Sequence, residues 1–325
     1  MPQNAMKKEQ TPETLRAMVH KCFGEEIEMR SFRPLDEGYC NMAYAMELSD
    51  GRRVICKIAP EDKSRFLRVE VNLMQAEVRA MELVQEKTRV PVAPVYQYDD
   101  SCTVCKSPYF FMKELKGQSL VSVRDSLPPA VKEGIYWELG QMERRINQVT
   151  HDTFGFVGDE RTFADWFSAF SRMMDDLFLD AEAKKIDFGV PFDTLRARLR
   201  QDEDCFRAVT VPQLIHWDLW DGNVFVLDGH ICGLIDWERA LWGDPLMDDR
   251  FRRHERNEAF LTGYGQKEFS TGETCRILWY DLFLYGVMMT EGAYRGYPDD
   301  SQYEWAKPLF VQSFRELQLL KSQEE

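Results

Sequence analysis

The sequence predicts an α+β fold, with an N-terminal antiparallel sheet followed by a mainly helical C-terminal part. Apolar and polar residues alternate in strand-like runs within the first 115 residues, as half-buried strands require. After Pro128-Pro129, apolar residues recur at the three- and four-residue spacing of helices. The 325 residues are 44% hydrophobic, which suffices for a sizeable core and about two domains. We expect these domains at residues 1–115 and 116–325.

The first part is predicted to open with a helix over residues 12–23, because Thr11-Pro12 suits an N-cap and a first-turn proline. Residues 36–48 contain a turn between two strand-like runs, and residues 53–58 alternate like a half-buried strand. From about Asn72 onward an apolar stripe predicts a helix. The stripe consists of Leu73, Ala76, Ala80, Leu83 and Val84.

The second part is predicted to contain a series of helices after a connection at residues 116–127. In the first of them, apolar residues recur every three or four positions, at Ile135, Leu139, Met142 and Ile146. A short apolar run at residues 231–235 reads as a buried strand. Further helical patterns lie near residues 163–180, 192–206, 272–294 and 301–320.

The most informative motif places His216, Asp218 and Asn223 in one loop, with Asp218 five positions before Asn223. The same interval separates the catalytic Asp from the metal-binding Asn in phosphoryl-transfer loops. The strand at residues 231–235 then delivers Asp236, whose carboxylate suits Mg²⁺. Asp221-Gly222 alone would indicate an ordinary turn, but the combined motifs favour phosphoryl transfer.

An upstream lysine completes this chemistry. Residues 53–58 match a V-A-I-K pattern in which Lys57 would pair with ATP phosphates. Its acidic partner is expected on the following helix, where Glu77 is our choice and Glu70 and Glu82 are the rivals. Before this strand, Gly38 allows close backbone approach and Asn41 tolerates unusual backbone angles, as a phosphate-covering loop needs.

Together these segments resemble the aminoglycoside phosphotransferase and choline kinase-like superfamily of small-molecule kinases, with matching motifs from about Gly38 to Asp248. The resemblance implies a two-lobed protein-kinase-like fold, with a nucleotide-binding lobe at residues 1–115 and a catalytic, substrate-binding lobe at residues 116–325. It implies ATP and Mg²⁺ as cofactors.

The resemblance also implies the roles of individual residues. Asp218 would be the catalytic base, and Asn223 and Asp236 would hold the metal. Main-chain groups of Lys113 and Leu115 would meet adenine. The remaining nucleotide-binding residues would be Gly38, Asn41, Lys57 and Glu77.

Two positions depart from the superfamily's pattern. Trp217 stands where a small residue is common, which puts the packing of the loop in question, and Asn147 stands where many relatives have histidine. Gly243-Asp244-Pro245 followed by Asp248 resembles the closing motif after the metal-binding acid. Residues 237–261 contain no Ser, Thr or Tyr, so the regulated hydroxyl of protein kinases is missing and a small-molecule substrate fits better.

Composition excludes several other classes of protein. Eight irregularly placed cysteines do not suggest a disulfide framework, and Cys102 and Cys105 favour packing in a hairpin over a redox or zinc site. No run of eighteen apolar residues occurs and the start lacks a hydrophobic signal region, so we expect a cytoplasmic protein that does not span a membrane. Its oligomeric state stays open.

Charge is concentrated in the second part. Residues 1–115 carry 18 acidic and 17 basic side chains, and residues 116–325 carry 37 and 24, so their net charges are −1 and −13. A negative field favours a cationic acceptor, although acidity also serves solubility. The absence of Lys and Arg clusters argues against nucleic acid.

The sequence therefore predicts an ATP-dependent kinase for a hydroxyl of a small molecule, with an aminoglycoside-like antibiotic or other amine-bearing metabolite favoured. Ketosamine, choline-like and sugar acceptors stay open. A nucleotide-binding pseudokinase scaffold is the alternative of a different class, because the phosphate loop has one glycine where three are usual. Aromatic residues of the second part suit an acceptor pocket, but core packing is the better expectation. They are Trp166, Trp220, Trp242, Trp279, Tyr285 and Tyr294.

Overall fold

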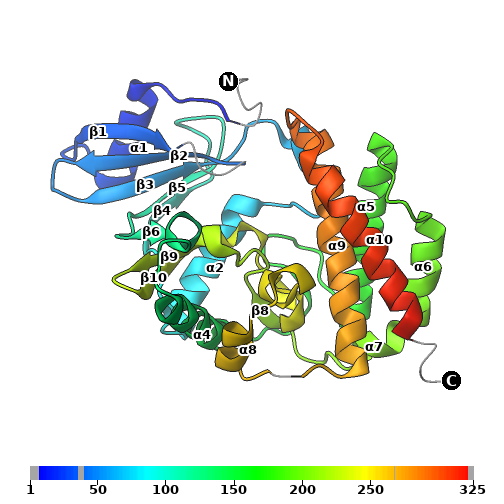
Figure 1. Ribbon diagram of the computed structural model, residues 1–325. Coiled ribbons are helices and arrows are strands. Elements are labelled where there is room, and N and C mark those ends of the chain that lie inside the picture. Colours follow the sequence, from blue (N-terminus) through cyan, green and yellow to red (C-terminus); the bar gives the residue numbers. More distant parts are fainter. Residues whose placement is uncertain (1–6, 36–39, 267, 321–325) are drawn as a thin grey trace.

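The computed structural model describes residues 7–35, 40–266 and 268–320. A sheet-containing part with the first helix lies at one end of the molecule, and long helices pack at the other (Figure 1). This arrangement confirms the predicted α+β fold with an N-terminal antiparallel sheet and a helical C-terminal part.

The N-terminal sheet has five strands in the order β1-β2-β3-β5-β4, and neighbouring strands are antiparallel. Alternation along β3 turns Val54, Cys56 and Ile58 into a core beneath α1, which begins at the predicted Thr11 cap. Lys57 consequently points to the opposite face. The elements of this part are α1 (Pro12–Phe23), β1 (Met29–Leu35), β2 (Met42–Leu48), β3 (Arg53–Ile58), α2 (Leu73–Lys87), β4 (Val95–Asp99) and β5 (Tyr109–Lys113).

The C-terminal part combines helices with two small three-stranded sheets, in the orders β10-β9-β6 and β7-β11-β8. Helix α9 packs against both α5 and α10 (Figure 1). The helices are α3 (Leu120–Val123), α4 (Pro129–Ile146), α5 (Trp166–Lys184), α6 (Phe192–Gln201), α7 (Glu203–Arg207), α8 (Glu258–Tyr264), α9 (Thr271–Arg295) and α10 (Ser301–Leu320). The strands are β6 (Gln118–Ser119), β7 (Gly155–Phe156), β8 (Gln213–Ile215), β9 (Val224–Leu227), β10 (His230–Leu234) and β11 (Leu241–Gly243).

One predicted helix is divided in the structure. Residues 192–206 form α6 and α7 because Asp202 leaves the helical conformation between them, with φ −96° and ψ 7°. The Asp202 carboxylate accepts hydrogen bonds from Arg198 Nε at 2.7 Å and from Trp279 Nε1 at 3.0 Å. The bond from Trp279 ties the break to α9.

The apolar core is continuous across the two parts. One cluster contains α2 residues such as Ala80 and Val84 together with Phe110 of β5 and the interior of the helical part. Among the aromatic residues expected in a core, four are at most 7% exposed, namely Trp166, Trp242, Trp279 and Tyr285, whereas Trp220 is 42% exposed. Cys102 and Cys105 lie in the connection between antiparallel β4 and β5, the hairpin position that the sequence predicted. In the described ranges, every helix is too short or too polar to cross a bilayer.

Candidate active site

The ammonium group of Lys57 lies between carboxylates from two distant segments. Its Nζ is 2.8 and 2.7 Å from the two oxygens of Glu77, and 2.5 Å from Asp236 Oδ1. Glu77 is fully buried, whereas the Asp236 side chain keeps 31% of its surface exposed. Burial lowers the pKa of Lys57, but Asp236 and Glu77 outweigh burial and raise it overall. Lys57 is therefore a charged bridge between the sheet, α2 and the end of β10.

The two rival acids point elsewhere. Glu82 is exposed on α2. Glu70, before the helix, accepts hydrogen bonds from Arg239 and Arg295. The structure thus brings Glu77 to Lys57.

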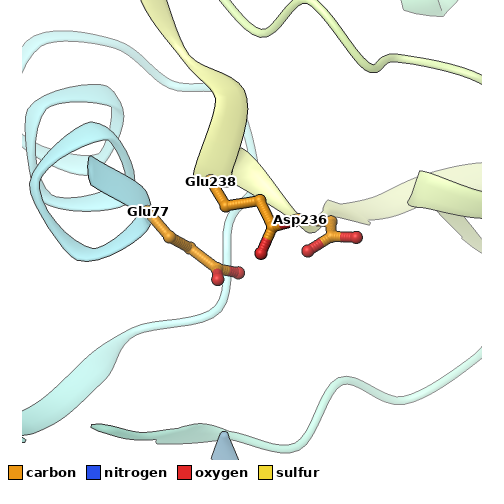
Figure 2. A group of neighbouring side chains, drawn as sticks. All are labelled: Glu77, Asp236 and Glu238. Atoms are coloured by element: carbon orange, nitrogen blue, oxygen red, sulfur yellow. The ribbon is translucent and has the colours of Figure 1, made fainter. Parts of the chain in front are cut away.

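Asp236 follows β10 in a left-handed conformation with φ 67°, which is unusual for a residue other than glycine. It lies close to Glu77 and Glu238, and one oxygen of each acid falls within 4.8 Å of the others (Figure 2). Burial raises the pKa of Asp236, but Lys57 overcomes that effect and lowers it overall. Asp236 therefore stays ionised.

His216 supports the loop that carries Asp218. Its Nε2 lies 2.9 Å from the carbonyl oxygen of Ile235, and its Nδ1 lies 3.3 Å from the backbone N–H of Asp218. Because a carbonyl oxygen only accepts, Nε2 carries the proton and Nδ1 accepts. Burial lowers the pKa of His216 to about 4, so the ring stays neutral. His216 thereby joins the Asp218 loop to the backbone just before Asp236.

Asn223 closes the same loop. Its Nδ2 donates to the backbone oxygen of Asp218 at 2.7 Å and to Asp218 Oδ2 at 3.2 Å. Burial raises the pKa of Asp218 well above its ordinary value, Arg239 opposes the rise, and Asp236, Asp249 and Glu238 add to it. A carboxylate with a raised pKa in a partly buried site suits a proton acceptor.

The residues predicted to hold a metal fit Mg²⁺. The backbone N–H of Ile235 donates to the carbonyl oxygen of Asn223 at 3.0 Å, which fixes the two loops side by side. Asp236 supplies an ionised, partly exposed carboxylate and Asn223 an amide oxygen. Mg²⁺ prefers oxygen ligands of this kind and usually keeps several waters.

The bulky Trp217 is accommodated in the loop. Its φ of 68° is left-handed, its N–H donates to Asp248 Oδ2 at 2.8 Å, and its side chain is buried. The ring packs against Phe283 of α9, with centroids 5.4 Å apart. The Arg239 guanidinium carbon lies 5.3 Å from the ring centroid. The indole is therefore a packed part of the loop.

The closing motif is structural in this chain. Asp248 holds the backbone of the Asp218 loop through Trp217, and Asp244 accepts hydrogen bonds from Arg276 and from the Tyr280 hydroxyl, both at 2.7 Å. Asn147 also supports this region, because its Nδ2 donates to the carbonyl oxygen of Leu214 at 2.9 Å.

Only one of the two residues predicted for the phosphate loop can be located, because Gly38 lies outside the described residues. Asn41 is described and buried, and its Nδ2 donates to Glu238 Oε2 at 2.6 Å. This contact joins residues 197 positions apart. Glu238 was not among the predicted site residues. Its position two residues after Asp236 was the one sequence feature that could have indicated it.

The expected adenine-binding segment follows β5. The N–H of Lys113 donates to the carbonyl oxygen of Pro94 at 2.9 Å. Because proline has no N–H, Pro94 returns no hydrogen bond to the Lys113 carbonyl. The Leu115 side chain covers Gly233 on β10 so closely that a Cβ at Gly233 would collide with it.

Known proteins share both the sequence pattern and the fold. The profile of the Phosphotransferase enzyme family matches residues 31–249. A comparison with curated protein sequences gave no significant match.

Solved structures with 13–17% identity extend the likeness to nearly the whole chain. A candidate aminoglycoside phosphotransferase from Ralstonia eutropha aligns with TM-score 0.65 and 13% identity, over 95% of this chain and 98% of the other. A thermostable mutant of aminoglycoside phosphotransferase APH(4)-Ia, in complex with AMP-PNP and hygromycin B, aligns with TM-score 0.65 and 17% identity, over 93% and 98%. The streptomycin–ATP complex of APH(2")-IIa aligns with TM-score 0.60 and 14% identity, over 96% and 97%.

The family match covers more than half of the chain, and its motifs meet in one site between the sheet and the helical part. The predicted superfamily and the kinase-like fold are thereby confirmed. The chain belongs to the phosphotransferase enzyme family and is a small-molecule kinase.

Proposed function

We propose that this kinase transfers the γ-phosphoryl group of ATP to a hydroxyl of an amine-bearing small molecule, such as an aminoglycoside-like antibiotic. The observation that carries the proposal is the bridge from Lys57 to Glu77 and Asp236, with Asp218 on the adjoining loop. In this proposal residues 1–115 bind the nucleotide, and residues 116–325 provide catalysis and the acceptor site.

The nucleotide would lie between these two parts. Lys57 would bind phosphate oxygens and Glu77 would hold the lysine in place, while Gly38 and Asn41 cover the phosphates. The Lys113 carbonyl and the Leu115 N–H would meet adenine. The missing N–H of Pro94 supports this role, because the Lys113 carbonyl gets no donor from that strand position.

Asn223 and Asp236 would hold Mg²⁺, which when bound neutralises charge on the transferring phosphates. Lys57 already brings a cation to Asp236 at 2.5 Å. The protein's own contribution to charge stabilisation is therefore pre-arranged, and an arranged dipole or charge costs no reorganisation during the reaction.

Asp218 would act as the base. The acceptor oxygen forms a bond to the γ-phosphorus as the bond from that phosphorus to the β,γ-bridging oxygen breaks, and ADP departs with the bonding electrons. The hydroxyl proton passes to Asp218 Oδ2 or Oδ1. Asn223 Nδ2, 3.2 Å from Oδ2, orients the carboxylate for this transfer.

An amine-bearing acceptor is supported by the charge of the second part, which is −13 over residues 116–325. Related structures carry hygromycin B, streptomycin or gentamicin. Ketosamines, choline-like amines and sugars are the competing acceptors. The pseudokinase alternative rests on the single glycine, Gly38, before Asn41.

ADP release from MgATP tests the proposal across aminoglycosides, other hydroxylated antibiotics, choline-like amines, ketosamines and sugars. Asp218→Asn is the control, since it keeps the shape of the side chain but removes the base. We expect nucleotide binding to persist and transfer to fall at least about 100-fold, the scale of general-base catalysis.

The assay separates the alternatives. Turnover with only one acceptor class names that class. ATP binding without transfer to any acceptor would favour the pseudokinase, and an Asp218→Asn variant with near-normal turnover would remove Asp218 from its role.

A further inference from the structure

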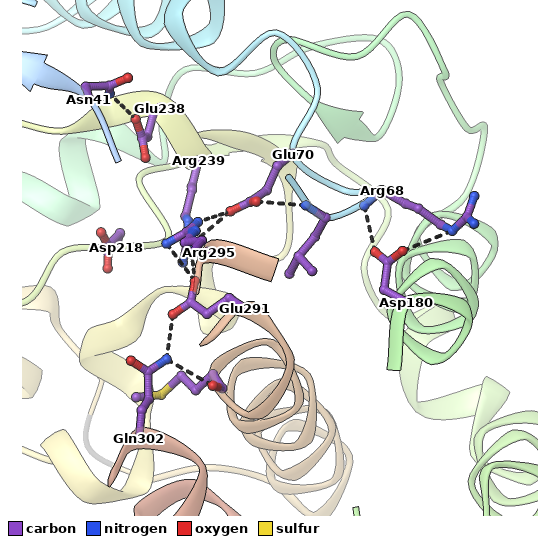
Figure 3. A network of polar contacts seen from close by, with 12 residues as sticks. Asn41, Arg68, Glu70, Asp180, Asp218, Glu238, Arg239, Glu291, Arg295 and Gln302 are labelled. Carbon is purple, nitrogen blue, oxygen red and sulfur yellow. Dashed lines mark hydrogen bonds and ion pairs between the residues drawn. The ribbon is translucent and has the colours of Figure 1, made fainter. Parts of the chain in front are cut away.

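The guanidinium group of Arg239 lies where four segments of the active site meet. Its Nη2 is 3.1 Å from Glu70 Oε1, before α2, and 2.8 Å from Glu291 Oε2 of α9. Its own backbone lies three positions after Asp236. The guanidinium carbon also lies over the ring of Trp217, in the loop of Asp218, 5.3 Å from the ring centroid. Figure 3 shows Arg239 with Glu70 and Glu291, and Asp218 lies nearby.

The surrounding ions hold Arg239 in a fixed place. Arg295 contacts the same two acids, at 2.5 Å from Glu70 and 2.9 Å from Glu291, and Gln302 of α10 donates to Glu291 at 2.6 Å. Two cations thus face two anions, and their side chains are 3–13% exposed. Buried charges paired in this way cannot move apart without leaving one of them uncompensated. Arg239 is therefore a fixed point against which the adjoining loop can rest.

Trp217 is the residue through which the Asp218 loop contacts Arg239. The ring lies against Arg239 on one side and approaches Phe283 of α9, while the backbone N–H of Trp217 donates to Asp248. Asp218 comes next in the chain, so a shift of the Trp217 backbone would carry Asp218 with it. Asp236 is tied to Arg239 through a single short turn of backbone, Trp237–Arg239. The contact between Trp217 and Arg239 therefore spans the two loops that carry Asp218 and Asp236.

We propose that Trp217 and Arg239 form a positioning pair that fixes Asp218 relative to Asp236 during phosphoryl transfer. The inference rests on the proposed function and adds two residues that act by placing Asp218. Its physical basis is that a displacement of about 1 Å at reacting groups costs on the order of 100-fold in rate. In this proposal the bulky Trp217 affects the rate of transfer by holding Asp218 in place.

A double-mutant cycle tests the pair. Trp217→Gly removes the ring at a position whose left-handed φ of 68° glycine adopts freely, so the backbone is not strained by the change. Arg239→Lys keeps the charge but removes the planar guanidinium that lies over the indole. We expect each change to lower kcat at least about 10-fold with the KM for ATP nearly unchanged. The double variant should be no slower than the slower single variant, because both changes remove one contact.

Arg295→Lys is the matched control. Arg295 has the same type of side chain, the same two glutamate partners and similar burial. Within the described part of the chain, however, Arg239 is the cation that stacks on Trp217. We expect Arg295→Lys to lower thermal stability about as much as Arg239→Lys and to leave kcat within about 2-fold. Trp217→Phe, which restores an aromatic face, should recover most of the lost kcat.

Three results would overturn the pair: normal kcat in both single variants, losses that multiply in the double variant, or an equal loss of kcat in Arg295→Lys. The wild-type enzyme, assayed alongside, distinguishes failure of the positioning pair from failure of the proposed function. If it transfers phosphate and the variants match it, only the positioning pair is wrong. If it binds nucleotide but transfers nothing to any acceptor, the proposed function and this inference both fail.

Discussion

The carboxylate of Asp218 is surrounded by groups that act on its pKa in opposite directions. Burial raises the pKa, Arg239 lowers it, and Asp236, Asp249 and Glu238 raise it further. As the proposed base, Asp218 must be ionised to accept a proton, so activity should be lost as the pH falls through this pKa. Because the net shift is upward, we expect the acidic limb of the kcat/KM profile to lie above the ordinary aspartate value of about 3.9.

A pH profile of kcat/KM measures this limb. Asp249→Asn removes one of the anions that raise the pKa, and it should therefore shift the limb to lower pH. A limb at the ordinary aspartate value, unmoved by Asp249→Asn, would contradict the electrostatic account of Asp218.

Site residues that are close in the sequence could be predicted from their spacing. Site residues whose contacts are distant in the sequence could not. Asp218 and Asn223 lie five positions apart and meet in one loop, as their spacing indicated. Glu238 and Arg239 were missed because their partners, Asn41 and Glu70, are 197 and 169 positions away. Glu70 was considered only as a partner of Lys57, since the sequence does not reveal which acid faces an arginine.

At the scale of elements, two glycines of α4 occupy contrasting surroundings. A Cβ at Gly134 would meet nothing within 4 Å, whereas a Cβ at Gly140 would collide with the carbonyl oxygen of Phe260 and the backbone nitrogen of Tyr264. Gly140 thus permits α4 and α8 to cross closely. We expect Gly134→Ala to stabilise the protein by about 1 kcal/mol through helix propensity, and Gly140→Ala to destabilise it by about 1–3 kcal/mol through overpacking.

Chemical denaturation of the two variants checks this contrast, with Gly134→Ala as the control for the change from glycine to alanine. Equal effects of the two substitutions would mean that the crossing of α4 and α8 is wider than described.

Helix existence was more predictable than helix ends. The apolar stripe correctly predicted α2, but its start at Leu73 follows from the preceding turn rather than from a side-chain cap. Asn72 is left-handed, with φ 48°, and its side chain donates to the carbonyl oxygen of Gly158 at 3.1 Å. That tertiary contact has no local signature. The division between α6 and α7 was missed for the same reason, because Trp279 and Asp202 are 77 positions apart.

At the scale of the whole molecule, nucleotide binding should stabilise the fold, because the proposed site between the two parts exists only in the folded protein. A non-hydrolysable ATP analogue at about 100 times its Kd would add about 2.7 kcal/mol, which raises Tm by several degrees. We expect this shift to require Mg²⁺ in the wild type. Asp236→Ala should abolish the Mg²⁺-dependent rise in Tm, because it removes the ionised carboxylate proposed as a metal ligand.

Differential scanning calorimetry with AMP-PNP, with and without Mg²⁺, measures these shifts. Asp218→Asn serves as the control and should keep the Mg²⁺-dependent rise. A persistent Mg²⁺ effect in Asp236→Ala would place the metal on other residues.

The division between residues 115 and 116 stays a proposal about which part binds the nucleotide and which part binds the acceptor. It does not separate two apolar cores. Composition and periodicity changed near that point, so the sequence predicted two units. In the structure, Ala80, Val84 and Phe110 belong to the same apolar cluster as the helical part. A sequence shows which residues are apolar but not which apolar faces meet, and for that reason the shared core was not predictable.

The ion pair between Glu70 and Arg295 also has a consequence for how the protein is made. The two residues are 225 positions apart. At a synthesis rate of about 5–20 residues per second, Glu70 leaves the peptidyl-transferase centre on the order of 10–50 s before its partner exists. During that interval its carboxylate must stay hydrated, and the turn before α2 has no anchor on α9. A nascent chain can therefore build its first sheet early, yet this contact between the two parts forms only after α9 has been translated.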